Sequence, residues 1–232
     1  MKRRNFLFAL TAAALVPAAR AQGKPIKIGI IGSGRIGSTF GALWAKAGHP
    51  IVFSDRDPEQ AKKAAESVGA GARAGTVEEA VGFGEAVLIA VPYGALPAIA
   101  KQVGDKLKGK VVIDPNNPVP ARDGELGAQA KEKGAAVSTA AIFPGAHLVR
   151  AFNSWGYQTM AREANRPAPR MAIPVAADDA QALKIGVQLV RDAGFDPVPA
   201  GSLAASKAFD LGSSVSGKVM TAEEMRKALS LP

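Results

Sequence analysis

The feature that most constrains this chain is a glycine-rich segment, "GSGRIG" at residues 32–37, set between two different hydrophobic patterns. Residues 27–31 before it form a short, largely apolar run that suits a parallel strand buried on both faces. After it, apolar residues recur at helical spacing until Gly48 ends the pattern. The glycines therefore lie in a strand–turn–helix unit, the context in which such a segment binds a dinucleotide.

Each glycine of this segment meets a different physical requirement of a dinucleotide-binding turn. Gly32 permits a tight turn, Gly34 lets the backbone approach a pyrophosphate, and Gly37 lets the helix pack closely on the strand. The phosphates would accept hydrogen bonds from the free N–H groups at the start of the helix. A purely structural turn is the alternative. We predict that the cofactor-binding residues here are Gly32, Ser33, Gly34, Arg35, Ile36 and Gly37.

Strand and helix patterns alternate through most of the remaining chain. Strands are predicted at 51–53, 86–91, 111–114, 148–152, 171–176 and 195–198, and helices at 59–68 and 179–193. Thr76 with Glu79, and Thr221 with Glu224, have the spacing of a capping box at a helix start. The alternation predicts an α/β fold, a doubly wound Rossmann-type parallel sheet followed by a small C-terminal α/β lobe.

The sequence divides into a predicted signal peptide at 1–21, a dinucleotide-binding Rossmann domain at 22–150 and a small C-terminal lobe at 151–232. In a doubly wound sheet the ligand lies outside the carboxyl ends of the strands. This rule selects the loops at 32–37, 54–56, 91–94 and 114–118. The glycine- and serine-rich stretch 211–218 reads as a linker rather than a lid.

Residues 1–21 have the order of an export signal: a basic start, an apolar run and the small-residue pattern Ala19-Arg20-Ala21. The apolar run from Phe6 to Val16 is too short to cross a bilayer, which takes about 20 residues. Arg3 and Arg4 resemble a twin-arginine signal, which exports folded proteins. We expect an exported, periplasmic protein without stable membrane insertion after cleavage. An uncleaved anchor is the alternative, and the protein is cytoplasmic if the signal is not used.

Charge and composition exclude several classes of function. The formal net charge is +9, but residues 1–21 supply four of the basic side chains, so the rest carries about +5. No dense basic stripe with interleaved aromatic residues is present, and we expect no nucleic-acid partner. The chain has no cysteine, which excludes disulfides and thiolate catalysis. His49 and His147 have no metal-site spacing, and no metal is expected.

The stretch Ser54-Asp55-Arg56 follows the second predicted strand, where the ribose of a dinucleotide should lie. An acidic residue there accepts hydrogen bonds from the ribose hydroxyls of NAD, whereas an arginine suits the 2′-phosphate of NADP. This chain has both: Arg56 could hold a 2′-phosphate, but Asp55 would repel it, so the local chemistry favours NAD.

Seven segments occur in the same order as in one known family: "IGIIGSGRIG", "RDPEQA", "VLIAVPYGAL", "VVIDPNNPV", "HLVRAFNSW", "AADDAQA" and "AGFDPVPAGSLAASKAF". In these segments the chain resembles the NADP oxidoreductases that depend on coenzyme F420, which are related to the dinucleotide-binding domain of membrane ferric reductases. The resemblance implies NADP as cofactor, with NAD as the alternative. Members of this type commonly have serine where this chain has Asp55, so the chain departs from the family pattern at that position.

The resemblance also implies where the nicotinamide end lies. Val91, Pro92 and Tyr93 would pass near the nicotinamide ribose, and Asn117 and Phe152 would lie near the reacting ring. Tyr93 and Trp155 could stack on a planar acceptor, with core packing as the alternative for each of these aromatic residues. The C-terminal lobe would help to build the acceptor site and a subunit contact, so a homodimer is part of the expectation.

No clear acid–base catalyst stands out in the sequence, and the catalytic residues remain unassigned. His147 reads as a loop or core residue, and Lys207 is a base only by its position near a helix start. Hydride transfer to a flavin or F420-type deazaflavin needs little acid–base help from the protein. We therefore expect an NADP-dependent oxidoreductase that uses such a small-molecule acceptor. An alcohol or hydroxyacid dehydrogenase and a non-catalytic dinucleotide-binding module are the alternatives.

Overall fold

The structure, a computed structural model, describes residues 23–232. The export signal and the cleavage site expected at residues 1–21 lie outside the described residues. No helix among residues 23–232 is long and apolar enough to cross a membrane.

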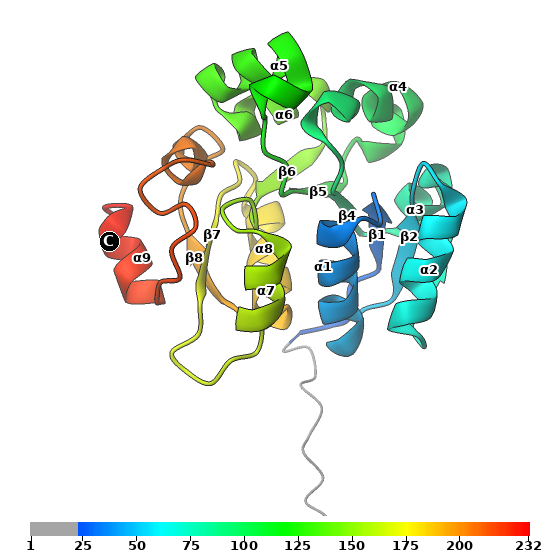
Figure 1. The fold of residues 1–232 in the computed structure, drawn as a ribbon, viewed down its shortest axis with the longest axis horizontal. Coiled ribbons are helices and arrows are strands. Elements are labelled where there is room, and N and C mark those ends of the chain that lie inside the picture. The colour runs from blue at the N-terminus through cyan, green and yellow to red at the C-terminus, as the bar shows by residue number, and fades with distance from the viewer. Residues whose placement is uncertain (1–22) are drawn as a thin grey trace, which may run out of the picture.

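The centre of the fold is a parallel sheet of six strands in the order β3-β2-β1-β4-β5-β6 (Figure 1). The strands are β1 (Ile28–Ile31), β2 (Ile51–Ser54), β3 (Ala72–Ala74), β4 (Ala86–Ile89), β5 (Val111–Asp114) and β6 (His147–Arg150). Strand order reverses between β1 and β4, which creates the crevice where doubly wound folds bind their ligands. The prediction of a Rossmann-type parallel sheet is confirmed.

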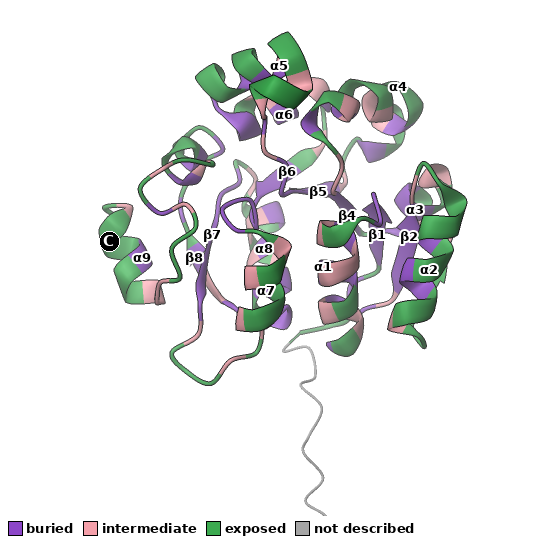
Figure 2. Ribbon diagram, viewed as in Figure 1, coloured by how far each residue is buried: buried purple, intermediate pink, exposed green. Residues whose placement is uncertain are grey.

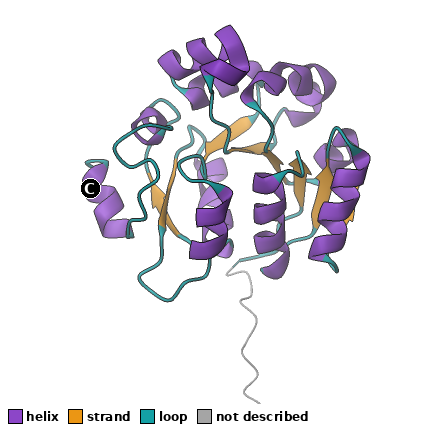
Figure 3. Ribbon diagram, in the orientation of Figure 1, coloured by secondary structure: helices purple, strands orange, loops and turns teal. Residues whose placement is uncertain are grey.

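Helices cover both faces of this sheet (Figures 1 and 3). They are α1 (Arg35–Lys46), α2 (Pro58–Val68), α3 (Val77–Phe83), α4 (Leu96–Leu107), α5 (Pro120–Lys133), α6 (Ala135–Ile142), α7 (Tyr157–Glu163), α8 (Ala180–Asp192) and α9 (Ala222–Ala228), with short 3₁₀ turns at Tyr93–Ala95 and Ala205–Phe209. Strands β1, β2, β4 and β5 are buried along their whole length, the edge strand β3 is partly exposed, and the outer helix faces are exposed (Figure 2). Ile30 packs into one hydrophobic cluster and its neighbour Ile31 into the other. This explains why the strands read as continuous apolar runs.

The C-terminal part contains a second, two-stranded parallel sheet, made of β7 (Ala172–Val175) and β8 (Asp196–Pro199) and joined through α8. An antiparallel bridge between Arg150 and Ala176 connects β6 to the end of β7. Hydrophobic residues of both parts belong to one cluster. The parts before and after residue 150 thus share a hydrogen-bonded bridge and one hydrophobic core. The domain boundary at residue 150 stays a prediction.

Local signals in the sequence explain several element ends. Thr76 and Glu79 form the expected capping box at α3, and Thr221 and Glu224 form the one at α9.

The segment 211–218, expected as a linker, consists of turns packed against the main body. Its Gly217 N–H donates to the carbonyl of Ser154 at 2.8 Å, and the carbonyl of Lys218 accepts from Trp155 Nε1 at 3.0 Å.

Candidate dinucleotide and acceptor site

Three cavities lie at the carboxyl edge of the sheet and beside the C-terminal part. Cavity A, about 990 Å³, lies over the ends of β1 and β2 and includes Gly34 and Asp55 in its wall. Cavity B, about 580 Å³, is on the other side of Gly34 and reaches Asn117 and Trp155. Cavity C, about 410 Å³, shares Val119 with cavity B. Gly34 thus lies where one extended ligand would cross from A to B.

The glycine-rich loop turns sharply between β1 and α1, and its glycines differ in what they tolerate. Gly32 has φ +94°, a conformation that favours glycine, and a Cβ there would collide with the carbonyl of Ala90. A Cβ on Gly37 would collide with the Gly32 carbonyl. A Cβ on Gly34 would meet no atom within 4 Å, and its φ of −65° is ordinary. The fold itself therefore requires glycine at positions 32 and 37. At position 34 the fold would tolerate a side chain, and the glycine instead leaves open space in cavities A and B.

The start of α1 is suited to an anion. Gly34 is its N-cap and supplies no capping side chain, and the first turn contains no acidic residue. The first N–H groups of a helix have no partner within the helix, and the helix dipole favours negative charge there. The open space at Gly34 and these donors fit the pyrophosphate of a dinucleotide.

Asp55 lies at the end of β2 and is bound to the glycine-rich loop. Its Oδ2 accepts the backbone N–H of Ser33 at 2.7 Å and the Ser33 hydroxyl at 2.9 Å. Oδ1 accepts the N–H of Asp57 at 3.2 Å. The Ser33 side chain is thus buried against Asp55 and lies outside the walls of cavities A and B. Its predicted role in the site becomes one of orienting Asp55.

Arg56 presents a cation to cavity A. Its side chain is exposed and makes no hydrogen bond or ion pair with the residues that the structure describes. Lys62 lines the same cavity, with its ammonium 2.6 Å from Glu59. Arg56 and Lys62 are the cations that could hold a 2′-phosphate.

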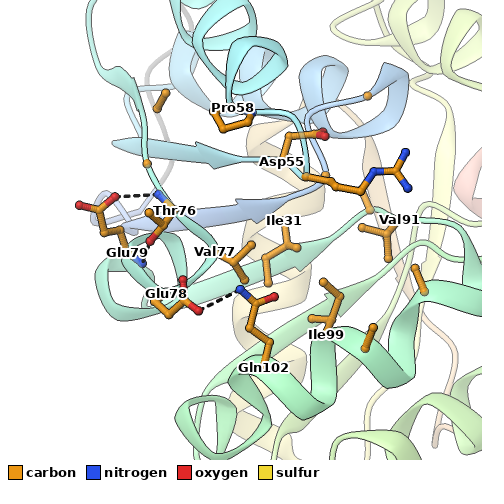
Figure 4. A pocket seen from close by; sticks show the side chains of 18 of the residues that line it. Ile31, Asp55, Pro58, Thr76, Val77, Glu78, Glu79, Val91, Ile99 and Gln102 are labelled. Carbon is orange, nitrogen blue, oxygen red and sulfur yellow. Dashed lines mark hydrogen bonds between the residues drawn. The ribbon is translucent and has the colours of Figure 1, made fainter.

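The far wall of cavity A was not predicted from the sequence. In Figure 4 Asp55 and Pro58 lie on one side, facing Val77, Ile99 and Gln102. This wall lies between the start of α3 and the side of α4, and these residues carry no motif. Their position follows from the packing of two helices, which the order of the segments alone does not give.

Two predicted cofactor-binding residues, Ser54 and Tyr93, have side chains buried in the core. Ser54 is fully buried, lies outside the walls of the three cavities, and donates its hydroxyl to the carbonyl of Ile30 at 2.8 Å. Tyr93 is also fully buried, and its hydroxyl donates to the carbonyl of Ala135 at 3.3 Å. Burial raises the pKa of the Tyr93 phenol above its usual value. Its ring therefore packs in the core and is not available to stack on an acceptor.

The residues after β4 and β5 form the shared wall of the site. Val91 and Pro92 line both cavity A and cavity B. Asn117 lines cavity B and donates its amide to the carbonyl of Asn153 at 2.6 Å. The structure thus brings these residues together beside Gly34, as the resemblance implied for the nicotinamide end.

Phe152 and Trp155 close the opposite side of cavity B. Phe152 has φ +64°, a strained conformation for an aromatic residue, and its ring centroid lies 4.2 Å from that of Phe40. Trp155 is 6% exposed and is fixed by the hydrogen bond to Lys218. Phe152 is therefore mainly a core residue, and Trp155 is the aromatic side chain placed to contact a ligand.

A buried ion-pair network supports the loop after β5, and sequence analysis missed it. The fully buried Arg150 donates to Asp114 Oδ2 at 3.2 Å and to Asp210 Oδ1 at 2.7 Å. It also donates to the carbonyl of Asn116 and to Asn117 Oδ1. Burial raises the pKa of Asp114, and the adjacent Arg150 guanidinium opposes that rise. An arginine inside an apolar strand pattern was the available signal, because buried arginine is rare unless paired.

The wall of cavity B contains no histidine, carboxylate, lysine or tyrosine, and its ionisable side chains are Arg35 and Arg122. His147 lies elsewhere, half-exposed, with Nδ1 3.8 Å from Asp179. Lys207 donates to the carbonyl of Glu132 at 2.7 Å and lines cavity C. No group of three or more histidine or acidic residues in the described part of the chain could hold a metal ion.

The comparison with protein families agrees with this geometry. Residues 27–118 match the family described as NADP oxidoreductase, coenzyme F420-dependent. Over this segment the chain is similar to that family. It contains the glycine-rich loop, Asp55, Arg56 and the loops after β4 and β5. The resemblance drawn from the sequence is confirmed, and the family members are NADP oxidoreductases by description.

Solved structures share the fold over a longer part of the chain. A hypothetical protein from Sinorhizobium meliloti is 25% identical, with a TM-score of 0.72 over 84% of this chain and 95% of its own. A putative F420-dependent NADP-reductase from Arthrobacter sp. FB24 is 18% identical, with a TM-score of 0.63 over 79% of this chain and 88% of its own. The 3-hydroxyisobutyrate dehydrogenase of Mycobacterium tuberculosis is 17% identical, with a TM-score of 0.59 over 80% of this chain and 57% of its own. No curated protein sequence matches the chain.

The family match over residues 27–118 and the shared fold support an NAD(P)-binding oxidoreductase. The loop, the free helix start and the open space at Gly34 fit the pyrophosphate of the cofactor. Cavity A would then take the adenosine half and cavity B the nicotinamide half.

Proposed function

We propose that the protein transfers hydride between NADP(H) and a flavin or an F420-type deazaflavin. The observation that carries this proposal is the wall of cavity B, which lacks any side chain suited to general acid–base catalysis. A carbonyl or alcohol substrate needs a proton moved together with the hydride, and a positioned group must move it. A flavin-like ring accepts the hydride and its two electrons on the ring itself, and its ring nitrogen can take a proton from solvent.

The residues of the chain then act by binding and orientation. Gly34 and the first N–H groups of α1 would hold the pyrophosphate, and the residues of cavity B would receive the nicotinamide half. The nicotinamide supplies the hydride chemistry when it is bound. Trp155 offers its ring to the acceptor, and Asn117 is held in place by Arg150 and Asn153.

NADP is the proposed cofactor because Arg56 has an unpaired guanidinium at cavity A. The bidentate geometry of arginine suits a phosphate. Asp55 already accepts two hydrogen bonds from Ser33, which stabilise its negative charge. NAD is the second candidate, because a carboxylate has further lone pairs that could accept a ribose hydroxyl.

The test is a panel of acceptors with NADPH as donor, followed at the absorbance of the nicotinamide. Flavins and a deazaflavin should be reduced, whereas 2-oxoacids, aldehydes and imines should not. A dehydrogenase of the alternative type would reverse this pattern and would show an essential base in its pH–rate profile. Tight NADPH binding without turnover of any acceptor would identify a non-catalytic binding module and overturn the proposal.

We also propose that residues 1–21 direct export through the twin-arginine route. The support is the Arg3-Arg4 pair and the small residues before Gln22. A reporter fused to these residues should be exported, and changing both arginines to lysine should stop export. Continued export of the lysine variant would contradict the twin-arginine assignment.

A further inference from the structure

Cavity C begins where cavity B ends. The two cavities share Val119 and Leu211, which come from the loop after β5 and from the segment after the second 3₁₀ turn. Leu211 is 51% exposed, so its side chain is open to a ligand that passes between the two cavities. An acceptor ring in cavity B could therefore extend a side chain across Leu211 into cavity C.

The wall of cavity C is cationic. Lys131 from α5 is exposed and has no hydrogen-bonding or ionic partner among the described residues. Lys207 donates one hydrogen bond to the Glu132 carbonyl, and an ammonium group has two further donors. Both ammonium groups are available to an anion in the cavity.

The one carboxylate in this wall is already neutralised. Asp210 Oδ1 accepts from Arg150 at 2.7 Å, and its Oδ2 accepts the N–H of Ala135 at 3.1 Å. Its charge is therefore matched by a buried guanidinium rather than presented to a ligand. The two lysines determine the sign of the cavity.

A buried donor without a partner lies in the same wall. The Oγ of Ser213 is buried and makes no hydrogen bond within the described residues. A buried hydroxyl without a partner is costly, and a ligand oxygen would satisfy it. This hydroxyl and the two ammonium groups form a set of donors suited to a phosphate or carboxylate.

We propose that cavity C binds an anionic group, a phosphate or carboxylate, on the side chain of the acceptor whose ring lies in cavity B. This inference rests on the proposed function, because it concerns the same acceptor. It assigns Lys131, Lys207 and Ser213 to the recognition of that group. The protein should therefore distinguish flavins that differ only at the end of the side chain.

The test compares FMN with riboflavin, which share the ring and differ by one phosphate. With saturating NADPH, kcat/KM for FMN should exceed that for riboflavin by about tenfold, the size expected for a charge-assisted hydrogen bond. Lys131→Gln and Lys207→Gln should each reduce this ratio severalfold, and Ser213→Ala should reduce it less. Inorganic phosphate should inhibit FMN reduction more than riboflavin reduction.

Lys133→Gln is the matched control, because Lys133 is an exposed lysine on the same helix that does not line cavity C. Its ratio should equal that of the wild type, which separates the cavity from the general charge of α5. Equal turnover of FMN and riboflavin by the wild type would overturn this inference and leave the proposed function intact. A preference for FMN over riboflavin that both Lys131→Gln and Lys207→Gln retain would also overturn it. If neither flavin is reduced, nor a deazaflavin with or without its anionic side chain, the proposed function itself fails.

Discussion

Asp55, in the wall of cavity A, forms a closed pair with the buried Ser33, in which the aspartate accepts both the N–H and the hydroxyl of the serine. The pair joins the end of β2 to the turn after β1. It fixes the acidic residue beside the place for the ribose and leaves Arg56 free. Asp55 is fixed by its hydrogen bonds, whereas the adjacent Arg56 has no partner among the described residues. We expect these two residues together to determine the cofactor preference.

Changing Arg56 to alanine should weaken NADPH binding about tenfold and leave NADH binding almost unchanged. The reason is the loss of a charge-assisted contact to the 2′-phosphate. Stability should stay within about 0.5 kcal/mol of the wild type, because Arg56 has no partner among the described residues. Fluorescence titration with both nucleotides measures the first effect and urea unfolding the second.

Asp55→Ser is the complementary variant for the same titration. Removing the carboxylate should strengthen NADPH relative to NADH, because a negative charge next to the phosphate is lost. If NADH binds the wild type more tightly and this variant reverses the order, Asp55 determines the choice and NAD is the cofactor.

The glycines of the loop should separate folding from binding. Gly34→Ala should leave the free energy of unfolding nearly unchanged, because the added Cβ meets no atom within 4 Å. It should nevertheless weaken dinucleotide binding at least tenfold, because the methyl group would occupy the path of the pyrophosphate. Urea unfolding and nucleotide titration on one preparation give both quantities.

Gly37→Ala is the matched control and should show the opposite result. Its Cβ would collide with the carbonyl of Gly32, so the helix must move or the fold loses several kcal/mol. A Gly34→Ala protein that unfolds as easily as Gly37→Ala would refute the assignment of Gly34 to the ligand.

Much of this fold follows from local patterns that act over a few residues. The capping box of Thr76 and Glu79 and the apolar run before Gly32 each determine one element without help from distant segments. The same is true of the loop ends that carry Asp55 and Val91, because parallel strands place their carboxyl ends at one edge. Those parts of the site were predicted.

The residues whose surroundings the sequence did not predict depend on distant partners. Tyr93 follows β4 at the expected place, but its ring packs against α6, where its hydroxyl meets the Ala135 carbonyl. Asp210 is far from Arg150 in sequence, and nothing local predicts that they meet at 2.7 Å. Side-chain direction in a 3₁₀ turn, and contacts between lobes, are set by tertiary packing.

Arg150 should be among the most costly residues to remove. Arg150→Met leaves Asp114 buried without its cation, which typically costs 3–5 kcal/mol. Asp114→Asn combined with Arg150→Met should recover part of this loss, because the uncompensated charge is gone and coupled changes are not additive. Urea unfolding of the two single variants and the double variant measures the coupling. A strictly additive result would show that the pair is not an energetic unit.

Asp123 should give the protein a specific sensitivity to acid. Its carboxylate accepts from Arg122 Nε at 2.9 Å, from the Val119 N–H at 2.8 Å and from the Gly94 N–H at 3.0 Å. The Arg122 hydrogen bonds, followed by these backbone donors, lower its pKa to about 2. The folded-state pKa is thus below the unfolded value of about 3.9, so the stabilisation is complete above that value and is lost as pH falls toward 2.

Asp123→Asn should therefore lower the free energy of unfolding by about 2 kcal/mol at pH 7, and the difference from the wild type should shrink between pH 5 and pH 2. The amide that replaces one oxygen would also face N–H donors, which prevents a simple exchange of hydrogen bonds. Glu125→Gln, an exposed change on the same helix, should stay within about 0.5 kcal/mol at every pH. Urea unfolding at pH 7, 4 and 3 provides the comparison. A difference that does not change with pH would mean that the carboxylate charge of Asp123 does not hold the loops after β4 and β5 together.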